Sequence, residues 1–261
     1  MLRYRDFPFP LNVLLNVLAR EEGRVESMHY GLFEAAGDSI GAAQERSTAL
    51  LLSRLPPAPG RLLEVGIGLG TTLARLVSLG YDAEGITPDS IQAEAARERF
   101  GEALRVHTAP LETFEAQAPF EIVIFQESSQ YIDCETLFQR VRNLSAPGAT
   151  VVVLDEFALA EIDRPQSLPR LDRFLAAAAR AFFVLQEELD LTGPAAPTVD
   201  YFLERIPRHR AAIESELAVT PAQLDGLLES GAAYRDLYRT GVYGYRLLRF
   251  RGPRETGAIA T

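Results

Sequence analysis

The feature that most constrains this chain is a glycine-rich turn that follows a short apolar segment. Residues 62–72 read LLEVGIGLGTT, the pattern of a buried strand, a turn and the start of a helix. Gly66, Gly68 and Gly70 let the backbone turn tightly and approach a ligand where a Cβ would clash. Many glycine turns are only turns, so by itself the motif predicts the strand–turn–helix unit more firmly than a ligand.

Apolar strand-like segments alternate with helical segments after this turn. The predicted strands are 61–66, 83–87, 104–108, 120–125, 150–154, 182–191 and 242–250. The predicted helices among them are 71–79, 89–100, 133–144 and 168–180. Alternation of this kind implies right-handed crossovers and a mainly parallel sheet with helices on both faces. We therefore expect a Rossmann-like α/β fold.

A proline-rich cluster at residues 56–60 (PPAPG) marks the best candidate boundary. Residues 1–55 look helical and contain no convincing strand, so we expect them to form a helical N-terminal cap. Residues 56–261 would form the core, with a helical insertion at about 160–235. The apolar stretch 11–18 is short and contains Asn12 and Asn16. It predicts an amphipathic helix, and we expect neither a signal peptide nor insertion into a membrane.

Charge and residue usage exclude several functions. The net charge is −10, which argues against a nucleic-acid partner because phosphate contacts need clustered cations. All 26 basic residues are arginines, so Schiff-base lysines and Walker-type phosphate binding are excluded. The one cysteine, Cys134, can form neither an internal disulfide nor a cysteine-rich metal site, and we expect a reducing, cytoplasmic location and no metal. A monomer and a homodimer are both open.

Two details of the glycine turn discriminate between cofactors. A dinucleotide fold usually has a third glycine at the position of Thr71, where a pyrophosphate rests on the helix N-terminus. The second detail is Glu64, two residues before the first glycine. Its carboxylate would repel a pyrophosphate and suits a ligand that carries an ammonium and a sulfonium. These residues disfavour a nicotinamide oxidoreductase.

The run Glu64-x-Gly66-x-Gly68-x-Gly70 resembles the first motif of class I S-adenosylmethionine (SAM)-dependent methyltransferases. The resemblance covers residues 60–156 well and 242–250 more loosely, as the antiparallel last strand of a seven-stranded sheet. It implies that the loop from Gly66 to Gly70, with Thr71 after it, passes under the methionine part of SAM. It also implies that Glu64 contacts the amino group of SAM, although Glu64 could instead cap nearby backbone amides.

The second strand ends in Thr87 where most of these enzymes have an acidic residue. Thr87 followed by Gln92 resembles the branch that contains the cyclopropane fatty acid synthases and many natural-product methyltransferases. In that branch Thr87 and Gln92 would share the ribose. Leu111 would pack on the adenine, or belong to the core, and Glu112 would accept from the exocyclic amine or support its loop.

The fourth strand leads into the polar run Gln126–Ile132. Ligands bind beyond the carboxyl ends of parallel strands, so we expect Gln126 to line the SAM pocket and Gln130 and Tyr131 to face the substrate. Cyclopropane synthases carry a Glu-His pair in this loop, and Ser129 and Gln130 stand at those positions. The difference puts cyclopropanation in doubt and favours ordinary methyl transfer.

Further candidates come from the segments around the core. His29, Tyr131 and Asp155 are the candidate catalytic residues, and Glu156 next to Asp155 is an alternative base. Candidate substrate-binding residues are Tyr30, Gln130, Arg170, Thr198, Tyr201 and Tyr243. Arg164 and Arg170 could pair with the carboxylates at 155 and 156 or anchor an acidic substrate. The tyrosines at 234, 238, 243 and 245 are more typical of core packing.

The resemblance implies an enzyme that transfers the SAM methyl group to an oxygen, nitrogen or carbon of a small molecule, for example in natural-product biosynthesis, with S-adenosylhomocysteine (SAH) as product. No base is diagnostic, because a base is needed only when the acceptor is protonated. An enzyme of this fold that catalyses a cyclisation, and a non-catalytic SAM-binding protein, are the alternatives.

Overall fold

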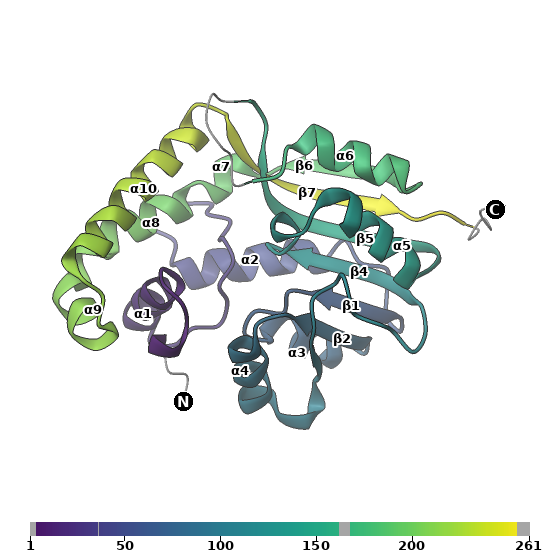
Figure 1. Ribbon diagram of the computed structural model, residues 1–261, viewed down its shortest axis with the longest axis horizontal. Helices are drawn as coiled ribbons and strands as arrows, with labels where there is room; N and C mark the ends of the chain where they lie inside the picture. The colour runs from purple at the N-terminus through teal and green to yellow at the C-terminus, as the bar shows by residue number, and fades with distance from the viewer. Residues whose placement is uncertain (1–3, 36, 162–167, 255–261) are drawn as a thin grey trace.

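The computed structural model describes residues 4–35, 37–161 and 168–254 of the 261-residue chain. Its centre is one seven-stranded sheet with the order β3-β2-β1-β4-β5-β7-β6 (Figure 1). The first five strands in chain order pair in parallel, and β7 pairs antiparallel to both β5 and β6. The strands are β1 Arg61–Val65, β2 Asp82–Thr87, β3 Arg105–Thr108, β4 Phe120–Gln126, β5 Ser145–Ala158, β6 Val184–Asp190 and β7 Tyr243–Arg251.

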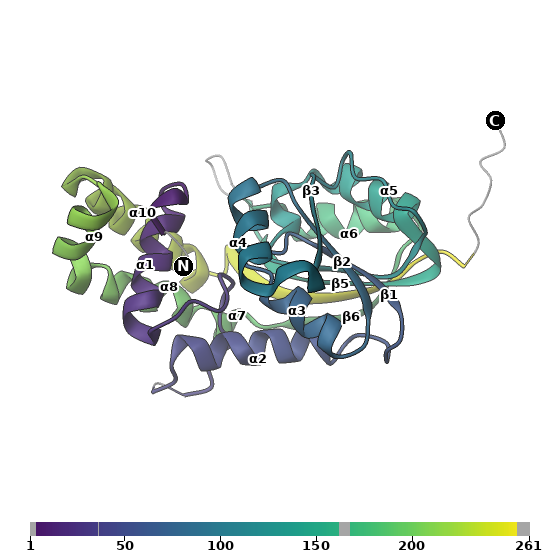
Figure 2. The same cartoon turned by 90° about the horizontal axis from the view of Figure 1, so that it is seen from below.

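Helices cover both faces of the sheet, as Figure 2 shows. The helices α5 and α6 pack on one face through a phenylalanine-rich cluster, and α2, α3 and α4 contribute to the apolar cluster on the other face. The described helices are α1 Leu11–Glu22, α2 Ile40–Leu52, α3 Thr71–Ser78, α4 Ser90–Phe100, α5 Cys134–Leu144, α6 Leu171–Arg180, α7 Thr192–Ala195, α8 Pro197–Arg205, α9 Arg210–Leu217 and α10 Pro221–Arg239. The expected Rossmann-like fold is confirmed.

The central strands are apolar on both faces because helices cover both. Residues 122–126 of β4 and 149–158 of β5 are all buried, which is the pattern of a parallel strand inside a doubly covered sheet. Because β1 to β5 are parallel, the polar residues that follow these buried strands lie together at one edge of the sheet. The candidate site lies at that edge.

A third apolar cluster joins the N-terminal segment to the helices before β7. Side chains of α1, including Val13 and Leu15, are buried there with residues of α8, α9 and α10, such as Tyr201 and Ile213. In Figure 1 these helices stand together at one end of the sheet. The two segments that flank the core in sequence therefore form one helical layer beside it.

The last strand in the chain is not the border strand of the sheet, because β7 is inserted between β5 and β6. The helical region before β7 extends to Arg239, slightly beyond the expected end at about residue 235. Among the described residues, we find no helix that combines the length and the apolar character needed to cross a membrane.

Candidate functional site

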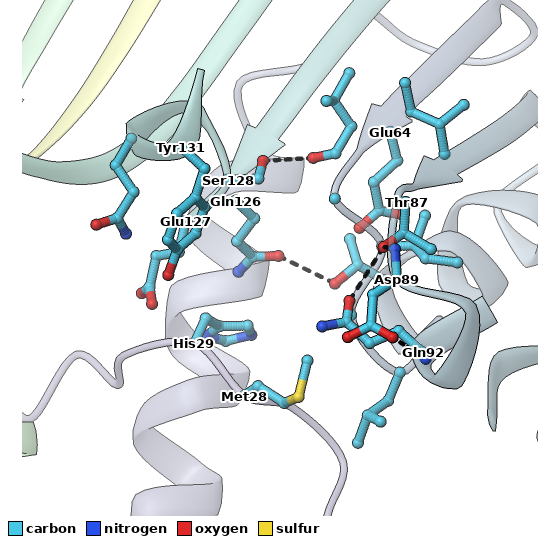
Figure 3. Close-up of a pocket in the computed structure, with 18 of the residues that line it drawn as sticks. Met28, His29, Glu64, Thr87, Asp89, Gln92, Gln126, Glu127, Ser128 and Tyr131 are labelled. Carbon is cyan, nitrogen blue, oxygen red and sulfur yellow. Dashed lines mark hydrogen bonds between the residues drawn. The ribbon is translucent and has the colours of Figure 1, made fainter. Parts of the chain in front are cut away.

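A cavity of about 570 Å³ lies at the carboxyl ends of β1, β2 and β4. This is where ligands bind in open parallel sheets. Figure 3 shows Glu64, Thr87 and Gln92 on one side of the cavity and Gln126, Glu127 and Tyr131 on the other. The predicted residues that line it are His29, Tyr30, Glu64, Gly66, Gly68, Thr71, Thr87, Gln92, Leu111, Glu112, Gln126, Gln130 and Tyr131.

The glycine turn forms part of the cavity wall and needs its glycines for two different reasons. Gly66 has φ +79° and Gly68 φ +51°, conformations that side chains rarely adopt. A Cβ at Gly66 would lie 2.3 Å from the Cβ of Ser128, and one at Gly68 would lie 2.9 Å from Cε of Met28. The backbone of the turn therefore passes very close to the β4 loop and to the N-terminal segment.

Gly70 does not line the cavity. It is the N-cap of α3 with φ +78°, and a Cβ there would lie 2.8 Å from the Cβ of Ala96 in α4. Its role is to let two helices pack closely. This is a correction to its predicted place among ligand-binding residues.

Glu64 is a buried acid that accepts no hydrogen bond from the residues that the structure describes. Its side chain is 2% exposed, and Oε2 has no donor within reach among the described residues. Burial raises the pKa of Glu64 well above its ordinary value. A buried carboxylate that faces a cavity without a partner is unfavourable, so the arrangement calls for a hydrogen-bonding, preferably cationic, ligand group.

The end of β2 presents a second polar group. Thr87 is buried and donates its hydroxyl to Oε1 of Gln92 at 3.3 Å. Asp89 accepts hydrogen bonds from the backbone N–H groups of Ile91 and Gln92 and so caps α4. The cap holds the first turn of α4, and with it Gln92, beside the strand end.

A chain of hydrogen bonds fixes Gln126 between the core and the N-terminal segment. Thr72 donates to Gln126 Oε1 at 3.0 Å, and Gln126 Nε2 donates to the Thr48 hydroxyl at 3.3 Å. Thr48 in turn lies 3.0 Å from His29 Nε2, and His29 Nδ1 lies 2.9 Å from the carbonyl oxygen of Tyr30. All these groups are at least partly buried, so the chain sets one orientation for each side chain.

The same series of hydrogen bonds determines which nitrogen of His29 carries the proton. A carbonyl oxygen only accepts, so Nδ1 carries the proton and Nε2 accepts from Thr48. Burial lowers the pKa of His29 to about 4. His29 is a neutral wall residue whose basic nitrogen is already occupied, which does not favour the predicted catalytic role.

Two carboxylates, the buried Glu156 and the half-buried Glu127, stand with four tyrosines on the substrate side of the cavity. Glu127 Oε1 accepts the backbone N–H of Tyr30 at 2.6 Å and the hydroxyl of Tyr245 at 2.7 Å. Glu156 Oε1 accepts the hydroxyls of Tyr234, at 2.9 Å, and of Tyr238. Tyr30, Tyr234 and both carboxylates line the cavity. The tyrosines therefore do more than pack the core.

Burial and mutual repulsion alter both acids. Burial, followed by the charge of Glu156, raises the pKa of Glu127 well above its ordinary value. Burial raises the pKa of Glu156 to about 7, against the lowering effect of the Tyr238 and Tyr234 hydroxyls. Glu156 therefore titrates close to neutrality.

Several predicted residues are not brought to the cavity. Asp155 is fully buried, and its Oδ2 accepts from Ser129 N at 2.8 Å, Ser129 Oγ at 2.6 Å and Gln130 N at 3.2 Å. These contacts make Asp155 the residue that positions the loop after β4. Burial raises its pKa to about 6.

The predicted substrate residues outside the core have other partners. Arg170 pairs with Asp172 and Glu161 and lines a neighbouring surface depression, which shares Gln130, Tyr131 and Ile132 with the cavity. Thr198 accepts from the backbone N–H of Gly31 at 3.1 Å, Tyr201 packs in the helical layer, and Tyr243 packs against Tyr234. None of these four lines the cavity, and Arg164 lies outside the described residues.

The sequence did not single out several residues that do line the cavity: Met28, Glu127, Ser128 and Tyr234. Glu127 directly follows the predicted Gln126, but only its left-handed backbone, at φ +56°, turns it back toward the N-terminal segment. Tyr234 lies in α10, whose packing on the core is a tertiary contact. A polar run after a buried strand was the one available signal for Glu127 and Ser128.

The structure of this chain resembles those of known proteins, whereas its sequence matches neither a family model nor a curated protein. A cyclopropane synthase from Mycobacterium tuberculosis matches the structure with a TM-score of 0.80 at 16% identity, over 96% of both chains. The cyclase SpnF matches with a TM-score of 0.78 at 20% identity, over 93% of both chains.

A third similar structure is geranyl diphosphate C-methyltransferase from Streptomyces coelicolor, crystallised with Mg²⁺, geranyl-S-thiolodiphosphate and SAH. Its TM-score is 0.68 at 16% identity, over 95% of both chains. Together these similarities define the fold as that of the SAM-dependent methyltransferases. Within it, the chain has the architecture of the branch that holds the cyclopropane synthases, the cyclase and this C-methyltransferase.

Proposed function

We propose that this chain binds SAM in the cavity and transfers the methyl group to a small molecule enclosed with it. The observation that carries the proposal is the buried Glu64, a residue of the cavity wall whose Oε2 has no partner among the described residues, beside a turn with three glycines at positive φ. Solved structures of this fold contain SAH or SAM.

The residues present fit SAM along the whole wall. Glu64 supplies an acceptor for the α-ammonium, and Gly66 and Gly68 leave room for the methionine part. Thr87 and Gln92 supply hydroxyl and amide groups for the ribose, and their mutual 3.3 Å hydrogen bond is weak enough to be exchanged. Leu111, 2% exposed in the core cluster and also on the cavity wall, offers an apolar surface for the adenine, with Glu112 next to it.

SAM supplies a methyl group already activated on a sulfonium. The chain has to orient an acceptor in line with that methyl group and exclude water, which accounts for most of the rate in such a reaction. The segment from Glu26 to Tyr30 lines the cavity together with Leu11 and Leu14 of α1. We infer that residues before the proline cluster serve as the cap over the bound molecules.

Calorimetric titration with SAM and SAH tests the cofactor. We expect the wild type to bind both, Gly68→Arg to bind neither, and Glu64→Gln to bind each about tenfold more weakly because a charge-assisted hydrogen bond is lost. Gly226→Arg is the matched control, since Gly226 lies on an exposed part of α10 with nothing within 4 Å of its Cβ position. A folded wild type that binds neither compound would disprove the proposal.

Release of SAH in the presence of candidate acceptors tests the reaction. Methyl transfer consumes SAM stoichiometrically with the product. A cyclisation would change the acceptor while SAM persists, and a non-catalytic protein would change neither compound. Either of these results in a protein that binds SAM would limit the proposal to cofactor binding.

A further inference from the structure

The charges that line the cavity are all of one sign. Among its described lining residues there is no arginine, and the chain contains no lysine at all. The only histidine on the wall is His29, which is neutral for the reasons given above. Glu156 is nevertheless buried and Glu127 half-buried on the substrate side, with the buried Asp155 close to both. An anionic acceptor would meet only negative charge there.

The hydrogen-bond donors that the structure describes around the two carboxylates are neutral, and they donate hydrogen bonds to only one of the two oxygens of each carboxylate. Both hydrogen bonds to Glu127 end on Oε1, so no described residue donates to its Oε2. Both hydroxyl bonds to Glu156 likewise end on Oε1, and Tyr30 also approaches that carboxylate. Hydroxyls and one amide orient these acids without neutralising them. Two neighbouring acids that are withdrawn from water and have no cationic partner among the described residues are unfavourable as carboxylates, so a bound cation would complete the arrangement.

The rest of the wall favours an organic cation over a metal ion. Among the described residues, no group of three or more His, Cys, Asp or Glu side chains could hold a metal. Tyr30 and Tyr234 line the cavity beside the carboxylates, and their rings pack against Tyr238, Tyr243 and Tyr245, so this part of the wall is aromatic and has no described metal-ligating side chains besides the two acids. Leu11, Leu14 and Ile132 add aliphatic surface for an apolar body.

We propose that the methyl acceptor is a primary or secondary amine with an apolar body, whose ammonium group is bound between Glu127 and Glu156. This inference rests on the proposed methyl transfer, since it names the acceptor of that reaction. Glu156 takes one proton from the ammonium group and frees the nitrogen lone pair. That nitrogen then bonds to the methyl carbon while the carbon–sulfur bond breaks, so the product is an N-methylated ammonium ion and a neutral thioether. The proton on Glu156 is finally released to water.

Binding to the SAH-saturated protein tests the inference apart from turnover. The probes share a body and differ in the terminal group: 2-phenylethylamine, 2-phenylethanol and 3-phenylpropanoate, with octylamine, octanol and octanoate as a second series. We expect each amine to bind at least about tenfold more tightly than its alcohol and the carboxylates not to bind, because the amine alone pairs with the buried acids. Glu127→Gln and Glu156→Gln should each weaken amine binding by roughly tenfold to a hundredfold and leave alcohol binding unchanged.

Glu135→Gln removes the same charge from an exposed ion pair with Arg180 and should change nothing. The SAH affinity and melting temperature of each variant report whether its fold is intact. Failure of the wild type to bind SAH would refute the proposed function itself. With SAH bound, the inference is overturned if neither amine binds, or if the alcohols bind as tightly as the amines. It is also overturned if the two glutamine variants weaken SAM relative to SAH and spare the amines, since the acids would then serve the sulfonium.

Discussion

Tyr245 in the last strand donates its hydroxyl hydrogen bond to Glu127, at the end of β4, over 2.7 Å and across 118 positions of sequence. The same oxygen of Glu127 accepts the backbone N–H of Tyr30. One carboxylate oxygen therefore joins the N-terminal segment, the centre of the sheet and the last strand. The other oxygen of Glu127, a residue of the cavity wall, accepts no hydrogen bond from the described residues.

Glu156 should make the ligand-free protein less stable as the pH rises. Its pKa is raised from 4.5 to about 7 by burial and by Asp155, against hydrogen bonds from tyrosines 30, 234 and 238. Between these values the folded state holds a proton that the unfolded state has lost, so stability falls as the pH rises through this window. Between about pH 5 and about pH 8 the wild type should lose more unfolding free energy than Glu156→Gln does. We expect the difference between the two losses to be on the order of 1–3 kcal/mol.

Urea unfolding at the two pH values measures this difference. Glu127 and Asp155 are present in both proteins and add a shared dependence of the same sign. Identical pH dependence in wild type and Glu156→Gln would show that Glu156 is already ionised in the empty cavity.

His29 should act by positioning rather than by proton transfer. With a pKa of about 4 it stays neutral across the working range, and its Nε2 is occupied by Thr48. We expect His29→Gln to lower the rate of SAH formation about three- to tenfold, because Gln126 is misplaced. The pH dependence of that rate should not change. His107→Gln, on a partly exposed histidine bonded to Glu84, is the control. If a rise or fall in rate with pH disappeared in His29→Gln but remained in Glu156→Gln, His29 would be the base.

The close approach of Gly66 to Ser128 should appear as an energetic coupling. Gly66→Ala adds a Cβ 2.3 Å from that of Ser128 at φ +79°, and we expect it to cost about 2–4 kcal/mol. Gly23→Ala has nearly the same φ, +75°, with nothing within 4 Å, so it measures the backbone term alone. Ser128→Gly combined with Gly66→Ala should recover about 1 kcal/mol or more relative to additivity in denaturant unfolding. If the effects of the two substitutions on the unfolding free energy simply added, the glycine turn would be able to move away from Ser128 without cost.

Asp155 should matter for stability and loop position. An asparagine there has one acceptor oxygen and an NH₂ group, so either the N–H groups of Ser129 and Gln130 or that of Glu156 would lose their acceptor. We expect Asp155→Asn to cost about 2–3 kcal/mol in urea unfolding. Asp133→Asn, at the N-cap of α5, should cost almost nothing because asparagine caps equally well. Equal effects at the two positions would contradict the role given to Asp155.

Local pattern was enough for the fold and for one side of the cavity. The apolar strands, the glycine turn and the helix caps are properties of neighbouring residues, so the predicted elements appear, most of them with small shifts at their ends, although β5 extends well beyond the predicted 150–154 in both directions. The place of Glu64 also follows from pattern, because the carboxyl ends of parallel strands meet at one edge of the sheet, and Thr87 and Gln92 were expected there from the family resemblance. The place of β7 between β5 and β6 depends on pairing among three strands, and no local signal specifies it.

The substrate side was decided by contacts between distant segments. Asp155 and Glu156 are adjacent in sequence, yet the alternation of a strand turns one toward the β4 loop and the other toward the cavity. Tyr30, Tyr234 and Tyr245 reach the two glutamates from a loop, a helix and a strand that only tertiary packing brings together. The sequence by itself determined that a glycine-rich turn would form at the end of β1. The charge and shape of the space opposite that turn were set by the tertiary structure, because burial and long-range hydrogen bonds decide which carboxylates face it.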